Sequence, residues 1–519
     1  MKRQSFATWR DRYAGTVAVI CVLVLTAVLN LTVYRLTDAF SLYLYSEETY
    51  EHTVGQGVLD GFADAEAKGD RVELIFCMPD DLLEDDRVYR LVRETARQLD
   101  EAFSFLSVRT VDAVARPDEV DEFRYVLREN GDGSYERVEA YTVGRESVIA
   151  KGPVSHTVLS MSSFFVLNSQ SSIEAYRGEE VMAGMIRYAL SDTHPKAYFT
   201  SGHGESTTSA LHDLLVCAGY ELSAIDLLSE TPDDTAGIFV VSNPLYDFYR
   251  GGEGVTAEIE KLRAYMENGG FVLLLLDPLA AYDENGTPKL PNLLSLAEEW
   301  GLSPQPAVIR DNAAAVTSDG YTVVCSYAEG GEAEALQSLV RPYNRARVLL
   351  REAAVLSVSE REGKTVSPLL VTSSSAVAVS GGKTVSDKGN YAVFAVSVQN
   401  TAVPGNSSAT GGASSASAVL SSDGSFAGGM AVSTSYYLGA VDALGSDEYG
   451  NAAFLYALFA RYRGQKTPVG ATKLKIGSTL LRDLTVREAR LWTLLVTGLP
   501  TLAVLAVGFT VIRRRRAAR

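Results

Sequence analysis

The sequence predicts an α/β protein in which two membrane helices bracket two extracytoplasmic domains. Uncharged apolar stretches lie near both ends, at Thr16–Tyr34 and Leu491–Ile512. Between them, the apolar runs Gly237–Ser242 and Phe271–Leu276 alternate with amphipathic segments. Strands that are apolar on both faces and alternate with helices indicate a parallel sheet covered on both sides. Residues 305–400 are rich in strand-forming residues, so we expect a doubly wound domain with β-rich additions.

Length and charge narrow the classes of function. At 519 residues the chain is too long for one ordinary domain. Its net charge of -17 argues against a general nucleic-acid-binding protein, which needs a basic surface to meet phosphates. The four cysteines form no CxxC pair and are far apart in the sequence. A disulfide framework is therefore not expected, and we interpret the cysteines as buried free thiols.

The N-terminal apolar stretch predicts an uncleaved membrane anchor at residues 13–37, preceded by a cytoplasmic segment at 1–12. With Tyr13–Gly15, the stretch reaches the length of about 20 residues that spans a bilayer. The alternative is a cleaved signal peptide. The run is longer than the apolar region of most signal peptides, and no small-x-small cleavage site follows cleanly.

The C-terminal stretch predicts a second membrane helix at 491–512. Arg513–Arg516 follow at once, and positively charged flanks stay in the cytoplasm, so the tail at 513–519 is expected there. Both termini would then be cytoplasmic and the bulk of the chain extracytoplasmic. The sequence thus predicts location in the cytoplasmic membrane, with a juxtamembrane segment at 471–490.

The first extracytoplasmic domain is predicted at 38–190. Arg71–Phe76 has the composition of a strand, Asp85–Phe105 has apolar residues at helical spacing, and Leu106–Val111 is a second strand. Strand, helix and strand in this order form the unit of an α/β domain. We expect Val120–Leu127 to continue as helix and Glu179–Leu190 to form another.

The second extracytoplasmic domain is predicted at 191–470 and begins with the stretch Lys196–Glu205. Ala197–Thr200 is apolar and β-prone, and Gly202 and Gly204 provide the backbone freedom of a tight turn. A helix then follows, with Ser206, Thr207 and Thr208 as candidate N-caps. Residues 403–429 are dense in Ser, Gly and Ala and predict a flexible loop.

Ligands of doubly wound sheets bind beyond the carboxyl ends of the strands. The candidate ligand-binding residues at these positions are His203, Glu205, Asn243, Asp277 and Tyr436. The alternative is structural: Asn and Asp before Pro close turns, and glycines around His203 serve the bend. We assign no residue of this set to catalysis.

The sequence contains no complete match to the motifs considered for a serine nucleophile, a zinc site or a phosphate-binding loop. Ser201 precedes Gly202-His-Gly, which is the wrong order for a G-x-S-x-G nucleophile elbow. The five histidines form no H-E-x-x-H motif. The Gly-Lys-Thr triplets at Gly363 and Gly382 lack the earlier glycine of a phosphate loop. We therefore expect no metal, no cofactor and no ATP binding by this chain.

The chain resembles the gliding-motility-type auxiliary subunit of bacterial ABC transporters, a substrate-binding-like family. The most specific matching element is Tyr198-Phe-Thr-Ser-Gly-His-Gly-Glu205. Weaker matches are Pro368-Leu-Leu-Val-Thr-Ser373, the segment from Asn451, and the terminal apolar stretch with its arginines. The resemblance implies a separately encoded ATPase and a multispan permease as partners. It also implies an intraflagellar-transport-type central domain, itself similar to a glutamine amidotransferase without its nucleophile.

Three functions follow as hypotheses. The first is a membrane-anchored, non-catalytic accessory subunit whose ectodomain binds an unknown cargo or braces the permease. The second is an ectoenzyme, a hydrolase or transferase with His203 as base and Glu205 as its orienting carboxylate. The third is a surface sensor for glycan or peptide that has no transporter partner.

Overall fold

The computed structural model describes residues 52–476, with gaps at 63–64, 66–68, 130–133, 168–171, 235, 253–256, 344–346, 401–426 and 447. Outside that range it describes only residues 28, 491, 506, 510, 513 and 514. All elements below belong to one compact unit, which contains the described residues 52–476. The predicted loop at 403–429 lies outside the described residues up to position 426.

No helix in the described part of the chain is long and apolar enough to cross a membrane. The longest described helix, α5 (Arg87–Ala102), has 16 residues and a charged outer face, whereas a span needs about 20 apolar residues. This finding corrects the prediction of two bracketing membrane helices, and with it the predicted location in a membrane with cytoplasmic termini. The segments 13–37 and 491–512 lie outside the described residues, apart from single positions.

The largest described sheet has nine strands in the order β10-β9-β11-β12-β21-β20-β17-β14-β15. The first five run parallel, and the others join antiparallel. The strands are β9 (Lys196–Thr200), β10 (Glu221–Ile225), β11 (Ile238–Ser242), β12 (Phe271–Leu275), β14 (Thr322–Tyr327), β15 (Arg347–Arg351), β17 (Lys364–Val371), β20 (Ala392–Gln399) and β21 (Gly429–Ser433). β11 and β12 are buried at every position, which explains their uninterrupted apolar sequences.

Helices cover both faces of this sheet. On one face, α8 (Glu258–Glu267) and α10 (Pro291–Glu299) share a core with side chains of β9, β11, β12 and β21. On the other face lie α7 (Ser209–Cys217) and α13 (Asn451–Arg463). There the Phe454 ring meets Phe394 edge-on at 4.8 Å, and the His212 ring meets Phe199 at 4.5 Å. The alternating side chains of each strand thus supply two separate cores.

A second sheet has four strands in the order β2-β1-β5-β6. These are β1 (Val72–Phe76), β2 (Leu106–Thr110), β5 (Ser147–Lys151) and β6 (His156–Ser160). β1 and β2 run parallel and are connected through α5, whose N-cap Asp86 accepts hydrogen bonds from the backbone of Val88 and Tyr89. The apolar face of α5 buries Leu91, Val92 and Leu99.

The prediction of a helix at Val120–Leu127 is wrong. A short 3-10 turn, η2 (Asp121–Arg124), leads directly into β3 (Tyr125–Glu129), which pairs antiparallel with β4 (Tyr135–Glu139). Val120 and Phe123 enter a core, at 1% and 3% exposure, but Leu127 lies on β3 and is 72% exposed, so no single helix face is buried along the whole segment. Instead, Arg137 lies over the Tyr125 ring at 3.9 Å, a cross-strand contact that suits a two-stranded ribbon.

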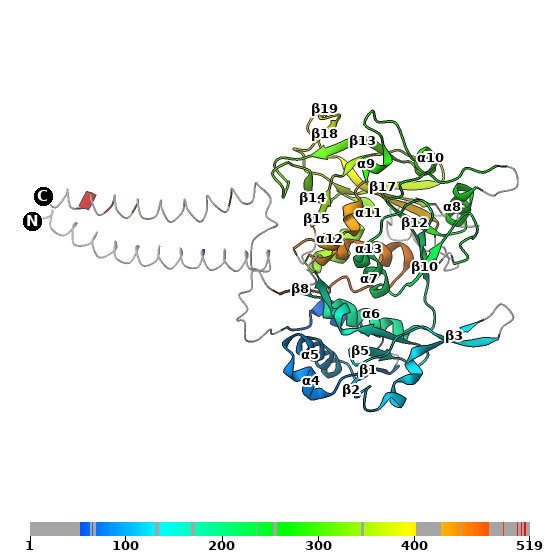
Figure 1. The fold of residues 1–519 in the computed structure, drawn as a ribbon. Helices are drawn as coiled ribbons and strands as arrows, with labels where there is room; N and C mark the ends of the chain where they lie inside the picture. The colour runs from blue at the N-terminus through cyan, green and yellow to red at the C-terminus, as the bar shows by residue number, and fades with distance from the viewer. Residues whose placement is uncertain are drawn as a thin grey trace, which may run out of the picture. The chain divides into compact units, whose positions relative to one another are not determined.

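Helix α6 (Gly178–Leu190) lies between the four-stranded sheet and α7 (Figure 1). It is buried around its whole circumference from Gly178 to Ile186, as expected for a helix with neighbours on every side. A Cβ at Gly184 would lie 2.6 Å from the Cα of Cys217, so α6 and α7 approach at a distance that only glycine permits. α6 is therefore the element that joins the two sheet systems.

The remaining elements are small. β16 (Ala354–Val358), β13 (Leu302–Arg310), β18 (Val377–Ser380) and β19 (Lys383–Thr384) form a four-stranded sheet, and β22 (Leu474–Lys475), β8 (Ile173–Tyr176) and β7 (Phe165–Leu167) form a three-stranded one. The other α-helices are α2 (Gln56–Asp60), α4 (Asp80–Asp85), α9 (Pro278–Ala281), α11 (Gly331–Val340) and α12 (Val441–Gly445). The other 3-10 turns are η1 (Pro117–Glu119), η3 (Met161–Phe164), η4 (Arg341–Tyr343) and η5 (Tyr436–Gly439).

Candidate functional site

The turn between β9 and α7 holds the first pair of candidate residues, His203 and Glu205. Gly202 has φ 106° and Gly204 has φ 69°, the left-handed region that favours glycine. A Cβ at Gly204 would lie 3.3 Å from Leu245 and Tyr246, so this glycine also permits close approach of the loop after β11. Thr208 then caps α7 by accepting a hydrogen bond from the backbone of Leu211.

His203 lies between two carboxylates. Its Nδ1 is 3.2 Å from Glu205 Oε1, and its Nε2 is 3.1 Å from Glu258 Oε2. The ring stacks on Phe248 with 4.0 Å between centroids, and the residue is 6% exposed. Both ring nitrogens therefore face an acceptor, which is the environment of an imidazolium that donates two hydrogen bonds.

The charges of this cluster support one another. Burial lowers the pKa of His203, but the hydrogen bonds to Glu205 and Glu258 outweigh burial and leave that pKa raised. Burial raises the pKa of Glu205, but its hydrogen bonds from His203 prevail and leave that pKa lowered. Each residue of this pair thus favours the charged form of the other.

Glu258 is a member of this cluster that the sequence analysis missed. It begins α8 and is 1% exposed, and its Oε2 also accepts a hydrogen bond from the backbone N–H of Tyr249 at 2.7 Å. The carbonyl of His203 accepts in turn from Leu245 and Tyr246. The cluster therefore ties the loop after β11 to the glycine turn and to α8. A glutamate at the first position of an amphipathic helix was the available signal.

Asn243 and Asp277 form a second pair, at the ends of β11 and β12. The Asn243 side chain accepts a hydrogen bond from the backbone N–H of Asp277 at 3.1 Å, and Asn243 has φ 46°. The Asp277 carboxylate caps α9 by accepting from Leu279. Both side chains are used to shape the strand ends. In the described residues no side-chain hydrogen bond joins this pair to His203 and Glu205.

The fifth candidate, Tyr436, has no described hydrogen bond to either of these pairs. It begins η5 and is half-buried, and burial raises the pKa of its hydroxyl. The neighbouring hydroxyls bond to backbone carbonyls: Ser433 to Ser435, Thr434 to Ala354, and Ser435 to Arg351. This segment connects β21 with β15 of the same sheet and with Ala354, the first residue of strand β16 (Ala354–Val358) in a separate sheet. The structure describes no hydrogen bond from Tyr436 to the other four candidates.

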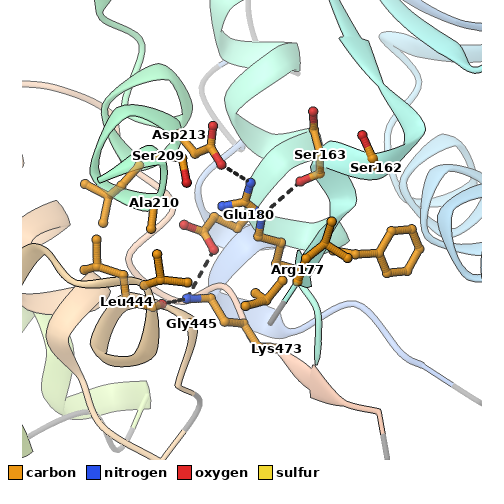
Figure 2. Close-up of a pocket in the computed structure, with 15 residues that line it drawn as sticks. Ser162, Ser163, Arg177, Glu180, Ser209, Ala210, Asp213, Leu444, Gly445 and Lys473 are labelled. Carbon is orange, nitrogen blue, oxygen red and sulfur yellow. Dashed lines mark hydrogen bonds and ion pairs between the residues drawn. The ribbon is translucent and has the colours of Figure 1, made fainter. Parts of the chain in front are cut away.

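Among the residues that the structure describes, no group of three or more His, Cys, Asp or Glu side chains is placed to hold a metal ion. The structure does show a charged cavity of about 230 Å³ at a position that the sequence analysis did not consider (Figure 2). Arg177, Glu180, Asp213 and Lys473 line it, together with Ser162, Ser163 and apolar residues. These residues come from segments that are far apart in sequence, so no local motif marks the cavity.

The sequence matches no family model and no curated protein. Among solved structures, the mmIFT52 N-terminal domain is 16% identical over 52% of this chain and 97% of that chain, with a TM-score of 0.33. A cold-adapted β-galactosidase from Rahnella sp. R3 is 12% identical over 54% of this chain and 33% of that chain, with a TM-score of 0.26. At these TM-scores neither similarity carries an argument about fold or function.

Proposed function

We propose that this chain is a non-catalytic accessory subunit of a bacterial ABC transporter, which binds cargo or braces the permease. ATP hydrolysis would take place in a separate subunit. The proposal rests on the resemblance of the stretch Tyr198–Glu205 and on the state of the histidine within it. It does not depend on a membrane anchor in this chain.

One observation supports a non-catalytic role: both ring nitrogens of His203 already have hydrogen-bond partners. A general base needs a ring nitrogen that can reach a substrate proton. In His203, Nδ1 is engaged by Glu205 and Nε2 by Glu258, and Phe248 covers the ring face. This arrangement favours a histidine that holds the turn and loop together, and it disfavours the alternative of a hydrolase or transferase.

Recovery of partners tests the transporter assignment. The tagged full-length chain would be isolated from its native cell in mild detergent, and the proteins recovered with it would be identified by mass spectrometry. We expect an ABC ATPase and a multispan permease, enriched over an untagged control. Absence of both, after crosslinking in intact cells as well, would contradict the proposal.

A binding module for peptide or glycan, without a transporter partner, is the second candidate. One observation favours it: the loop after β11 exposes apolar and aromatic side chains, with Leu245 at 52%, Tyr246 at 68% and Tyr249 at 41%. Aromatic rings at a surface are typical anchors for such ligands. The test is binding of the chain to peptides or glycans displayed on an array. This candidate is favoured if the wild type binds, the Tyr246→Ser variant does not, and no ATPase is recovered with the chain.

A further inference from the structure

The charged cavity lies where α6, α7 and the last described strand meet. Its walls come from η3 and β7, the start of α6, the first turns of α7, the end of α12, and Lys473 (Figure 2). The three charged side chains Arg177, Glu180 and Lys473 have exposures of 9%, 3% and 8%. So many buried charges at one place are costly to desolvate, which makes the cavity a candidate binding site.

Arg177 is held in place but is not saturated. Its Nη2 donates to Asp213 Oδ2 at 2.6 Å, and its Nε donates to the carbonyl of Ser163 at 2.9 Å. A guanidinium has five N–H donors in a planar fork, so further donors remain for a planar anionic group. Asp213 is 47% exposed at the rim of the cavity.

Glu180 supplies the opposite charge and a carboxylate oxygen, Oε2, that makes an ion pair but no hydrogen bond within the described part of the chain. Its Oε1 accepts from the Tyr456 hydroxyl at 2.5 Å, whereas its Oε2 accepts no hydrogen bond among the described residues. Lys473 Nζ lies 3.5 Å from Oε2 as an ion pair. Burial raises the pKa of Glu180, but Lys473 and Arg177 outweigh it and leave that pKa lowered, which favours the charged carboxylate.

The first turn of α7 adds a second set of donors. Ser209 and Ala210 line the cavity, and the first N–H groups of a helix have no partner within the helix. These groups and the helix dipole favour a negative group. Phe165, Val166 and Leu214 add an apolar wall.

The charges of the lining balance, because two cations face two carboxylates. A simple anion or cation would bring its charge against a buried group of the same sign. A molecule with one negative and one positive group meets both requirements, and the apolar wall suits a hydrocarbon side chain. We propose that this cavity binds a small zwitterion of the α-amino acid class with an apolar side chain.

In this arrangement Arg177 and the first turn of α7 hold the carboxylate of the ligand. Glu180 Oε2 and the rim carboxylate of Asp213 accept from its ammonium group. Charge-assisted hydrogen bonds of this kind are the strong ones in a site shielded from water. The proposal concerns the chain alone and does not rest on the transporter assignment, so either can fail without the other.

Calorimetric titration of the full-length chain with L-leucine and two matched analogues tests it. One analogue, 4-methylpentanoate, lacks the ammonium group, and the other, 3-methylbutylamine, lacks the carboxylate. L-Leucine is expected to bind, with each analogue at least about tenfold weaker, because each loses one set of charged hydrogen bonds. Absence of L-leucine binding overturns the proposal, and so does equal binding of either analogue.

Two variants connect binding with this cavity. Asp213→Asn removes one acceptor for the ammonium group, and Ala210→Leu fills the cavity from its exposed side; both should weaken L-leucine binding about tenfold or more. Asp80→Asn is the matched control, because Asp80 also pairs with an arginine, Arg93, at an exposed site away from the cavity. Circular dichroism verifies that all variants fold. Undiminished binding in both cavity variants overturns the proposal.

Discussion

His203 shows how a residue that suggests chemistry can serve a structural role. Its two carboxylate partners and the stacked Phe248 hold it at 6% exposure. Removal of the imidazolium would leave Glu205 and Glu258 facing each other without a counter-charge. Loss of one partner from a buried charged cluster is strongly destabilising, because the desolvated charges that remain are unpaired.

We therefore expect His203→Ala to lower the free energy of unfolding by about 3 kcal/mol. Urea denaturation at pH 6 followed by circular dichroism measures this value. His212→Ala is the control, because His212 makes an edge contact with Phe199 and a long hydrogen bond of 3.5 Å to Thr207. A His203→Ala variant as stable as His212→Ala would contradict the structural role.

The raised pKa of His203 also predicts a direction of pH dependence. A raised folded pKa gives stability that is fully present below the unfolded value of about 6.5 and lost as the pH rises through the folded pKa. The lowered pKa of Glu205 gives stability that is present above about 4.3 and lost as the pH falls through its folded pKa. The difference in unfolding free energy between the wild type and His203→Ala should be largest between about pH 5 and 6.5.

The same difference should shrink as the pH rises toward 9. Denaturation series at intervals across this range give the profile. Glu205→Gln in the His203→Ala background is the control, since the double variant lacks both titrating partners and should show a flatter profile. A wild-type advantage that grows above pH 7 would show that the histidine is neutral in the folded state.

At the scale of elements, the loop after β11 depends on the glycine turn after β9. The carbonyl of His203 accepts from Leu245 and Tyr246, and Gly204 lies against the same two side chains. The turn and loop therefore form one structural feature. The opposite end of β9 has a similar long-range contact, because the backbone N–H of Lys196 donates to the carboxylate of Asp234, 38 positions along the chain. Such links are invisible to local sequence patterns.

Gly204→Ala is expected to lower the free energy of unfolding by about 1–2 kcal/mol, because Gly204 has φ 69° and a Cβ there would crowd Leu245 and Tyr246. Gly363→Ala is the matched control: Gly363 has φ 73°, but a Cβ there would have no atom within 4 Å. Chemical denaturation should give the larger loss for Gly204→Ala. A larger loss for Gly363→Ala would mean that the turn and loop are not in tight contact.

At the scale of the whole described unit, α6 makes hydrogen bonds to segments near both ends of residues 52–476. The Glu179 carboxylate is fully buried and accepts from the backbone of Gly55 and of Thr472, each at 2.8 Å. The neighbouring Glu180 pairs with Lys473 in the charged cavity. One helix turn thus holds the first and last described segments, and β22 then adds to β8.

Glu179→Gln should loosen the segment at 472–476. The amide keeps only one acceptor atom, so one of the two backbone N–H groups loses its partner. We expect faster hydrogen exchange at Thr472 and its neighbours, measured by mass spectrometry, with the nine-stranded sheet unchanged. Glu174→Gln, an exposed change on β8, is the control. Unchanged exchange both at 472–476 and at Gly55 would contradict this role of Glu179.

Local patterns predicted several elements and failed where partners are distant. The apolar runs of β11 and β12, the turn with His203 and Glu205, and the helix carrying Leu211 could be read from short stretches. The helix predicted at Val120–Leu127 was wrong because only Val120 and Phe123 enter a core, whereas the segment from Tyr125 onward pairs across a hairpin. The bracketing membrane helices were predicted from composition alone, and the described structure does not support them.

The sequence by itself determined the local chemistry: where a strand ends, where glycine must occur, and that His203 and Glu205 share a turn. Only the tertiary structure decided what those side chains do, because Glu258, 55 residues away, occupies the second nitrogen of His203. The cavity around Arg177 and Lys473 likewise exists only after folding. Hydrophobic periodicity acts over a few residues, whereas hydrogen-bond saturation and charge balance depend on which distant segments the folded chain brings together.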